Sequence, residues 1–455
     1  MIKHTVSRLA LMSAALLAVS PASAETLQEA LAKAYVTNPS LQSARATLRA
    51  TDEGVAQAVS GWRPSLSVEA YSSAKNQETG TSGGKVNTQP KYVGVTLSQS
   101  IYAGGTTMAG IEAAESDVYA QRARLATEEQ TVLLNAASAY LNVLRDQAVV
   151  ELNVKNEEVL TSQLEATRDR FNVGEITRTD VHQAESRLAG ATADRIQAEG
   201  DLKTSRANYA NLIGDAPGTL ESPVLALPLP DSLDDALGLA ETNNPSVIAA
   251  DFDYKSATAD VDSNKGELLP SLDLSGTASR SLHTSSKGSW ANAAEARLTL
   301  SVPLYQSGSV YSQLRAARQT AAASRLDLDQ TRRDVAEEVR TAWETLASTQ
   351  ARIEAIKSQV LAAETALEGV QREASVGSRT VLDVLDAEQE LLDARVNLVK
   401  SQRDETVAEL TLLSSIGNLT AANMNLAVDF YNPEGHYQDV RNKWFGGDVE
   451  DEGSQ

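Results

Sequence analysis

Two very long stretches of the chain, residues 106–171 and 309–374, carry a repeating pattern of apolar positions. An apolar residue recurs every seven positions, as expected when one face of a helix packs against a partner helix. The first series is Ile111, Val118, Leu125, Val132 and Ala139, and the second is Leu314, Ala321, Leu328, Val335 and Ala342. At about 1.5 Å per residue each helix is roughly 100 Å long, which exceeds a globular domain and indicates a coiled-coil assembly.

In four shorter segments the pattern changes to strict alternation of apolar and polar residues. These predicted strands span about 65–74, 91–101, 271–280 and 293–302. A strand of about ten residues with one apolar side has the length and pattern of a tilted outer-membrane strand. The alternation alone fits a half-buried sheet in a soluble protein about equally well. Tyrosines near the strand ends are candidates for interfacial girdles, and they are Tyr71, Tyr92, Tyr102 and Tyr305.

Four strands are too few to close a membrane barrel, because such barrels begin at about eight strands. Open strand edges are not tolerated in lipid. If the strands span a membrane, the chain must therefore oligomerise. The pattern itself does not choose between two copies and three.

The chain is a duplication. Asn38-Pro39-Ser40 recurs as Asn244-Pro245-Ser246, and Pro64-Ser65-Leu66 recurs as Pro270-Ser271-Leu272. Each half begins with a helix of moderate length, continues through two strands and a long helix, and ends with a shorter returning helix. The predicted repeats span 25–230 and 231–424. The opening helices are expected at about 26–60 and 233–267, and the returning helices at about 177–212 and 380–415.

A short turn separates each long helix from its returning helix. Val173-Gly174 and Val376-Gly377 come first, and a Thr-x-x-Asp step follows from Thr177 to Asp180 and from Thr380 to Asp383. Glycine can end a helix in the left-handed conformation, and Thr with Asp three residues later can cap the next helix. The second copy is more acidic, since Asp386 shares a helix face with Asp383.

Composition and charge limit the possible functions. The chain has a net charge of −21 and no cysteine, which disfavours nucleic acid as a partner and excludes disulfides and thiolate metal sites. Residues 1–24 have the pattern of a signal peptide, with Lys3 and Arg8 before an apolar run and Ala22-Ser23-Ala24 at its end. In the tail, 425–455, we expect partial packing of Tyr431, Tyr437 and Trp444 followed by disorder.

Two other functional classes compete with a membrane channel. An enzyme is disfavoured, because His182, His283 and His436 are in no triad or metal-binding arrangement, and we expect no catalytic residue, metal or cofactor. A pore-free periplasmic coiled-coil adaptor or structural protein would explain the heptads. It would not need two strand pairs at equivalent points of a duplication.

These motifs together resemble the TolC-type outer-membrane efflux proteins over essentially the whole chain after residue 24. The resemblance rests on the repeated Asn-Pro-Ser, the Pro-Ser-Leu steps into strands, Tyr102-Ala103-Gly104-Gly105 and both Val-Gly turns. It implies a mainly α homotrimer with an α-helical periplasmic tunnel and a twelve-stranded β-barrel, four strands per chain, in outer-membrane lipid. It also implies a passive duct for efflux or type I secretion, docked through a periplasmic adaptor to an inner-membrane transporter.

The same resemblance implies roles for residues at the two turns. Asp383 and Asp386 match the acidic rings of the pore constriction, and Arg379 matches the gating arginine, whose partners are Thr179 and Asp180. The gating tyrosine of the family falls at Ala374. The adaptor-docking motifs match Val173, Gly174, Val376, Gly377 and Ser378, with Glu175 in place of an apolar residue. Helix capping is a second role open to Asp180 and Asp383, and three crowded copies of Asp383 and Asp386 are expected to raise some of their pKa values. The sequence leaves the exported substrate open.

Overall fold

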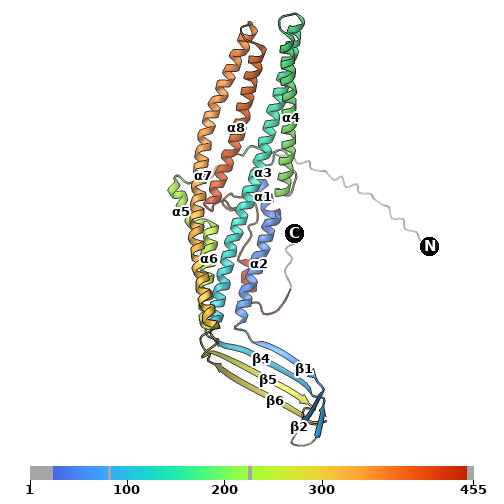
Figure 1. Cartoon of the computed structure of the whole chain (residues 1–455), viewed down its shortest axis with the longest axis vertical. Helices are drawn as coiled ribbons and strands as arrows, with labels where there is room; N and C mark the ends of the chain where they lie inside the picture. Colours follow the sequence, from blue (N-terminus) through green and yellow to red (C-terminus); the bar gives the residue numbers. More distant parts are fainter. Residues whose placement is uncertain (1–23, 80–83, 224–227, 448–455) are drawn as a thin grey trace, which may run out of the picture.

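The computed structural model describes residues 24–79, 84–223 and 228–447. It is a long rod of helices with a small, inclined sheet at one end, as Figure 1 shows. The prediction of a mainly α chain with a smaller β portion, to which each half contributes two strands of one sheet, is confirmed. Nearly all of the expected signal peptide, and the last part of the tail, lie outside the described residues.

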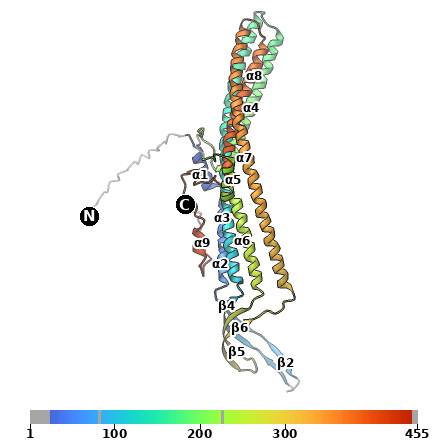
Figure 2. The ribbon, with the colours of Figure 1, turned by 90° about the vertical axis from the view of Figure 1, so that its left-hand side faces the viewer.

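The four longest helices form two antiparallel hairpins that run along the rod (Figure 1 and Figure 2). The first pairs α3 (Thr106–Asn172) with α4 (Arg178–Ile213), and the second pairs α7 (Ser309–Ser375) with α8 (Val381–Ser415). Both long helices have 67 residues. At about 1.5 Å per residue, each reaches from the sheet to the far end of the rod.

The expected opening helix of each half is two helices. They are α1 (Leu27–Thr37) and α2 (Pro39–Ser60) in the first half, and α5 (Leu233–Asn243) and α6 (Pro245–Gly266) in the second. A proline disfavours the helical conformation of the residue before it, and proline itself is well suited to the first helical position. One helix therefore ends and the next begins at each Asn-Pro step. The prediction of a continuous helix was wrong at this point.

The asparagine at each break also fastens the two ends of its half together. The Asn38 side chain accepts a hydrogen bond from the Ser40 N–H (2.9 Å) and donates one to the Leu212 carbonyl at the end of α4 (3.1 Å). Asn244 repeats this, accepting from the Ser246 N–H and donating to the Ser415 carbonyl at the end of α8. The repeated Asn-Pro-Ser motif is therefore a structural joint.

The main sheet is antiparallel, with the strand order β1-β4-β5-β6. Its strands are β1 (Ser65–Ser72), β4 (Lys91–Ala103), β5 (Ser271–Leu282) and β6 (Trp290–Ser301). The pair β4–β5 joins the two halves, and the register shifts between Ser100 and Tyr102. A separate hairpin of β2 (Lys75–Thr79) and β3 (Gly84–Thr88) occupies a polar segment that lies outside the four predicted strands, so these two strands were not predicted.

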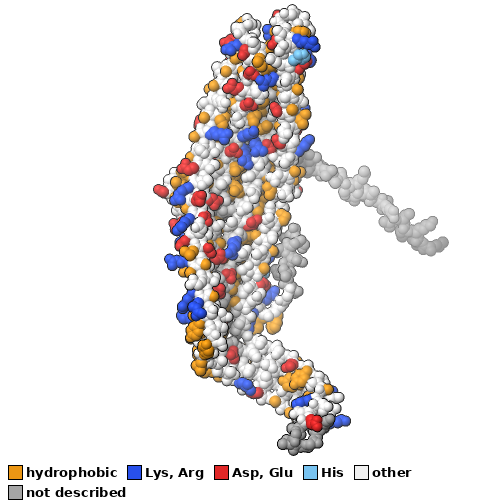
Figure 3. All heavy atoms as spheres, viewed as in Figure 1, with side chains coloured by type: hydrophobic (Ala, Val, Ile, Leu, Met, Phe, Trp, Pro, Cys, Tyr) orange, Lys and Arg blue, Asp and Glu red, His pale blue; other side chains and the backbone are white. Residues whose placement is uncertain are grey.

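The register collects the apolar residues of the four strands on one side of the sheet. Leu66 lies opposite Leu97, and Val68 lies opposite Val95, which in turn lies opposite Ala278. Leu66 and Val68 are 69% and 70% exposed, so none of the described residues covers them. On the face shown in Figure 3, acidic and basic side chains are interspersed along the helices, whereas hydrophobic side chains gather where the helices meet the sheet.

The main core lies midway along the rod, where α1, α3, α4 and the segment after α8 meet. Tyr140 of α3 is fully buried there. Its hydroxyl lies 2.7 Å from the Glu25 carbonyl and 2.6 Å from the Glu221 carbonyl, donates its proton to one of them, and accepts from the Glu221 N–H at 3.1 Å. Burial raises the pKa of Tyr140 to about 12, so the hydroxyl remains a donor at physiological pH.

After α8 the chain runs back along α2 and forms the short helix α9 (Gly435–Val440). Tyr431 and Tyr437 pack against the main core, and Tyr437 and Arg441 both contact Glu115 of α3. Trp444 is 59% exposed and lies beneath the Arg63 guanidinium, 5.0 Å from the ring centre. Within the described residues, no helix pairs sufficient length with sufficient apolarity to cross a bilayer.

Replacing Tyr140 with phenylalanine tests the core. The substitution keeps the ring but removes the hydrogen bonds of the hydroxyl to the Glu25 and Glu221 backbone, which costs about 0.5–1.5 kcal/mol of stability. We expect a lower apparent Tm for Tyr140→Phe in detergent, followed by circular dichroism. Tyr311→Phe is the matched control, because Tyr311 is 51% exposed. Equal Tm values for the two variants would show that the hydroxyl contributes nothing.

Candidate functional site

The residues singled out at the two turns lie together at the end of the rod farthest from the sheet (Figure 1). The first tip joins α3 to α4 through residues 173–177, and the second joins α7 to α8 through residues 376–380. The local sequence explains both turns, because each contains a residue that ends one helix and a residue that caps the next.

Each tip reverses direction at its glycine. Gly174 and Gly377 have φ values of 82° and 81°, in the left-handed region that side chains disfavour. The valine before each glycine points outward, with Val173 73% and Val376 78% exposed. The two valines are among the most exposed apolar residues of the chain, and their repetition at equivalent turns makes each tip a candidate contact surface.

The Thr and Asp of each turn form a capping box. Thr380 accepts a hydrogen bond from the Asp383 N–H (3.2 Å), and the Asp383 carboxylate accepts from the Thr380 N–H (2.9 Å) and hydroxyl (2.8 Å). Thr177 and Asp180 make the same contacts at the first tip. Capping by Asp180 and Asp383 is therefore confirmed.

Capping also fixes the charge of Asp383. Hydrogen bonds from the Thr380 backbone and side chain, with the nearby Arg379 charge, hold the pKa of Asp383 below its usual range. Within one chain Asp383 is therefore an anion at neutral pH. The stability that this cap supplies is present above the ordinary pKa of an aspartate and is lost as the pH falls through the lowered value.

Asp386, one turn further along α8, forms an ion pair with Arg187 of α4. This contact joins the two hairpins, and both side chains remain partly exposed, Arg187 at 39% and Asp386 at 54%. The sequence analysis missed Arg187. A single sequence carries no signal for this pair, because it depends on the register between helices that lie far apart in the chain.

Arg379 is paired within its own tip. Its side chain donates to the Glu373 carboxylate at 2.8 Å, and both residues are about half exposed. Thr179 and Asp180 lie on the other tip, and no hydrogen bond or ion pair joins them to Arg379 in the described chain. The expected gate partners are thus not brought together within a single copy.

The other turn residues make local contacts. The Ser378 hydroxyl donates to the Glu373 carbonyl at 2.9 Å, and Glu175 pairs with Arg170 at 3.1 Å. His182 contacts Glu185 at 3.0 Å, and no cluster of metal-binding side chains occurs in residues 24–79, 84–223 and 228–447. The tips therefore present charge and exposed valines, and they show the features of a contact surface.

A small apolar cluster holds the hairpins together just behind the tips. It combines residues of α3, α4 and α8, which are Leu160, Leu164, Val181, Ala184, Ala191, Val381 and Leu385. The main core is far larger and lies midway along the rod. The tips are therefore the least firmly packed part of the helical rod.

Comparison with known proteins supplies the wider context. The family described as "Outer membrane efflux protein" matches residues 28–215 and 236–418. The outer membrane efflux protein BepC of Brucella suis is 34% identical over 446 residues, which cover 98% of this chain and 96% of BepC. The outer membrane protein TolC of Escherichia coli is 28% identical over 413 residues, which cover 87% of this chain and 83% of TolC.

Solved structures show the same fold. The crystal structure of the outer membrane protein VceC from Vibrio cholerae superposes with a TM-score of 0.76 at 21% identity. The match covers 86% of this chain and 96% of VceC.

The capping geometry predicts the effect of removing the Thr380 hydroxyl. Thr380→Ala should destabilise the start of α8 by about 0.5–2 kcal/mol, because the Asp383 N–H loses its acceptor. Amide hydrogen exchange of the first turn of α8 should accelerate, while exchange in the middle of α3 stays unchanged. Thr380→Ser should restore slow exchange, because serine caps equally well. Fast exchange in both variants would mean that the hydroxyl is not the stabilising group.

Proposed function

This chain belongs to the outer membrane efflux protein family, and we propose that three copies of it form a passive exit duct for efflux or type I secretion. The protein is an outer-membrane channel that extends into the periplasm, in common with its relatives. The pore-free adaptor alternative is disfavoured, because the family consists of channels. We further propose that the mature chain begins after residue 24 and is built of the repeats 25–230 and 231–424, followed by the tail 425–455.

The open sheet carries this proposal. Its edge strands β1 and β6 each have a partner on one side only among the described strands. Every residue of both edge strands is exposed. Unpaired edges and an uncovered apolar side are stable in lipid only if the sheet closes. Three copies give twelve strands, with the apolar rows toward outer-membrane lipid and the polar rows toward the lumen.

The helices supply the periplasmic tunnel, and the tips supply its gate. In this arrangement the Asp383 and Asp386 carboxylates of three copies surround one narrow opening and favour cations over anions. Arg379 restrains the opening by pairing with Thr179 and Asp180 of a neighbouring copy, in exchange for its Glu373 contact. Alanine at position 374 leaves the gate more dependent on this arginine.

The exposed valines point to docking at the same end. We propose that Val173-Gly174 and Val376-Gly377-Ser378 receive a periplasmic adaptor, which connects the duct to an inner-membrane transporter. The duct itself binds no cofactor, and the transporter supplies the energy. Glu175 makes the first docking motif more polar than the second, so the adaptor surface that faces the first motif is expected to be polar as well.

Neutralising the two aspartates tests the acidic gate. Asp383→Asn combined with Asp386→Asn removes the charges and keeps an amide that can still cap the helix. In planar bilayers the purified wild-type protein should form a small cation-selective pore, and the double variant should lose that selectivity. Asp393→Asn, on an exposed position of α8, is the charge-matched control. Unchanged selectivity in the double variant would place the gate elsewhere, and absence of any pore from the folded wild-type trimer would refute the duct.

Replacing Arg379 tests the restraint on opening. Arg379→Ser should raise single-channel conductance, because the ion contacts that hold the tips together are lost. The control is Arg372→Ser, which removes the same charge from the last turn of α7, where Arg372 pairs only with Glu368. Equal conductance of wild type and Arg379→Ser contradicts the gating role.

A further inference from the structure

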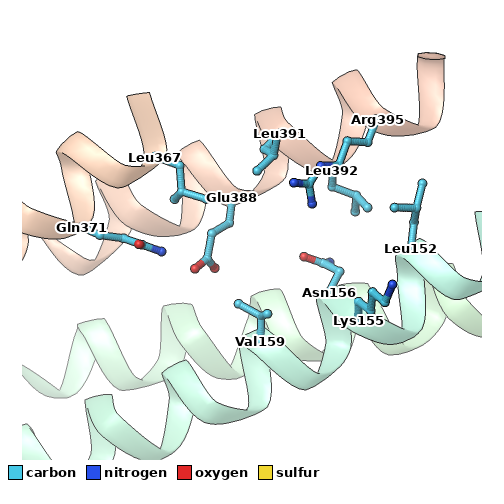
Figure 4. Close-up of a pocket in the computed structure, with 10 residues that line it drawn as sticks. All are labelled: Leu152, Lys155, Asn156, Val159, Leu367, Gln371, Glu388, Leu391, Leu392 and Arg395. Carbon is cyan, nitrogen blue, oxygen red and sulfur yellow. The ribbon is translucent and has the colours of Figure 1, made fainter. Parts of the chain in front are cut away.

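A cavity of about 200 Å³ lies between the two hairpins, behind the tips. Figure 4 shows α3 on one side and the α7–α8 hairpin on the other, with side chains from all three helices around the space. Its apolar walls are Leu152, Val159, Leu367, Leu391 and Leu392. The gate residues do not line it.

Glu388 of α8 is the unexplained group in this cavity. It is only 7% exposed, and its Oε2 atom is buried without a hydrogen-bond partner. In Figure 4 its carboxyl group points away from α8 into the space facing Val159. Leaving a buried carboxyl oxygen without a partner is costly, and such groups in folded proteins usually have a role.

Neighbouring groups do not neutralise this carboxyl. Gln371 of α7 offers a side-chain hydrogen bond, yet burial still raises the pKa of Glu388. Lys155 of α3 lines the cavity but pairs with Glu151 at 2.6 Å, and Arg395 of α8 pairs with Glu364 at 2.8 Å. Among the described residues no cationic side chain pairs with Glu388, and its Oε2 atom is open to a donor from outside the chain.

The shape and chemistry of the space define what fits. A cavity of about 150 Å³ is large enough for benzene in another protein, so this one has room for a single ring with a short side chain. The walls are apolar, and the polar lining holds the Glu388 carboxyl group, the amides of Gln371 and Asn156, and the side chains of Lys155 and Arg395, each of which is already paired with another acid. An ammonium group donates three hydrogen bonds and carries the complementary charge.

We propose that this cavity is a binding site for a compact primary ammonium ion on an apolar body, with the ammonium at Glu388 and the body between Val159 and Leu391. The bound ligand contacts α3 of the first hairpin and α8 of the second. It therefore favours the arrangement in which the two hairpins are packed together. The site is independent of the acidic ring proposed at the tips.

The test uses 2-phenylethylammonium as the probe and the full-length trimer in detergent, with binding followed by isothermal titration calorimetry. The Asp383→Asn plus Asp386→Asn background removes the acidic ring as a competing site, so the binding that remains in it is binding at Glu388. Adding Glu388→Gln should weaken binding at least about tenfold, because a charge-assisted hydrogen bond is lost. Glu390→Gln removes an equal charge from an exposed position of α8 and should leave affinity unchanged.

A second variant keeps the test decisive if Glu388→Gln folds poorly. Val159→Phe fills the cavity from the opposite wall and leaves Glu388 in place, so it should also abolish binding. 2-Phenylethanol has the same body without the charge and should bind much more weakly. The proposal is overturned if the alcohol binds equally, if Glu388→Gln retains affinity, or if neither the wild type nor the Asp383→Asn plus Asp386→Asn background binds the amine at millimolar concentration, which would mean that the cavity holds only water.

Discussion

A single-layer sheet has no core of its own, and this constraint shapes the whole molecule. Both edges of the β1-β4-β5-β6 sheet lack a partner on their outer side among the described strands, and its apolar rows are uncovered. Stability must therefore come from the helices within one chain, and from lipid and other copies around the sheet. The two helical hairpins provide the first part, since they carry both hydrophobic clusters.

Stability within the helical rod is unevenly distributed. The core midway along the rod includes Tyr140 and Tyr209, and the asparagine joints at Asn38 and Asn244 tie the helix ends to it. Toward the tips, the described residues connect the hairpins through a small apolar cluster and the exposed Arg187–Asp386 ion pair. Regions with few buried apolar contacts open at lower free energy than the core. The rod is thus a rigid body with one end able to rearrange.

Local patterns in the sequence predicted most of this architecture. Heptads place α3 and α7, alternation places the main strands, and the Thr-x-x-Asp steps place both caps, because each depends on residues close together in the chain. The break at Pro39 was missed, although the proline itself is the signal for it. The β2–β3 hairpin was missed because its polar segments lack apolar alternation. Arg187 with Asp386, and the burial of Glu388, depend on the register between two hairpins, which no local pattern encodes.

The charges at the tips serve two structural arrangements that exclude each other. Within one chain Asp383 caps α8, Asp386 pairs with Arg187, and Arg379 pairs with Glu373. A gate formed by several copies requires Arg379 to leave Glu373 and requires Asp386 to face the opening. Exposed ion pairs of this kind exchange at little cost, because water and salt screen both arrangements. Asp383 differs, since its cap orients the carboxylate without neutralising it. In the gate that we propose, the fixed charge of the opening therefore resides mainly at Asp383, and the exchangeable contacts of Arg379 and Asp386 set how easily the tips separate.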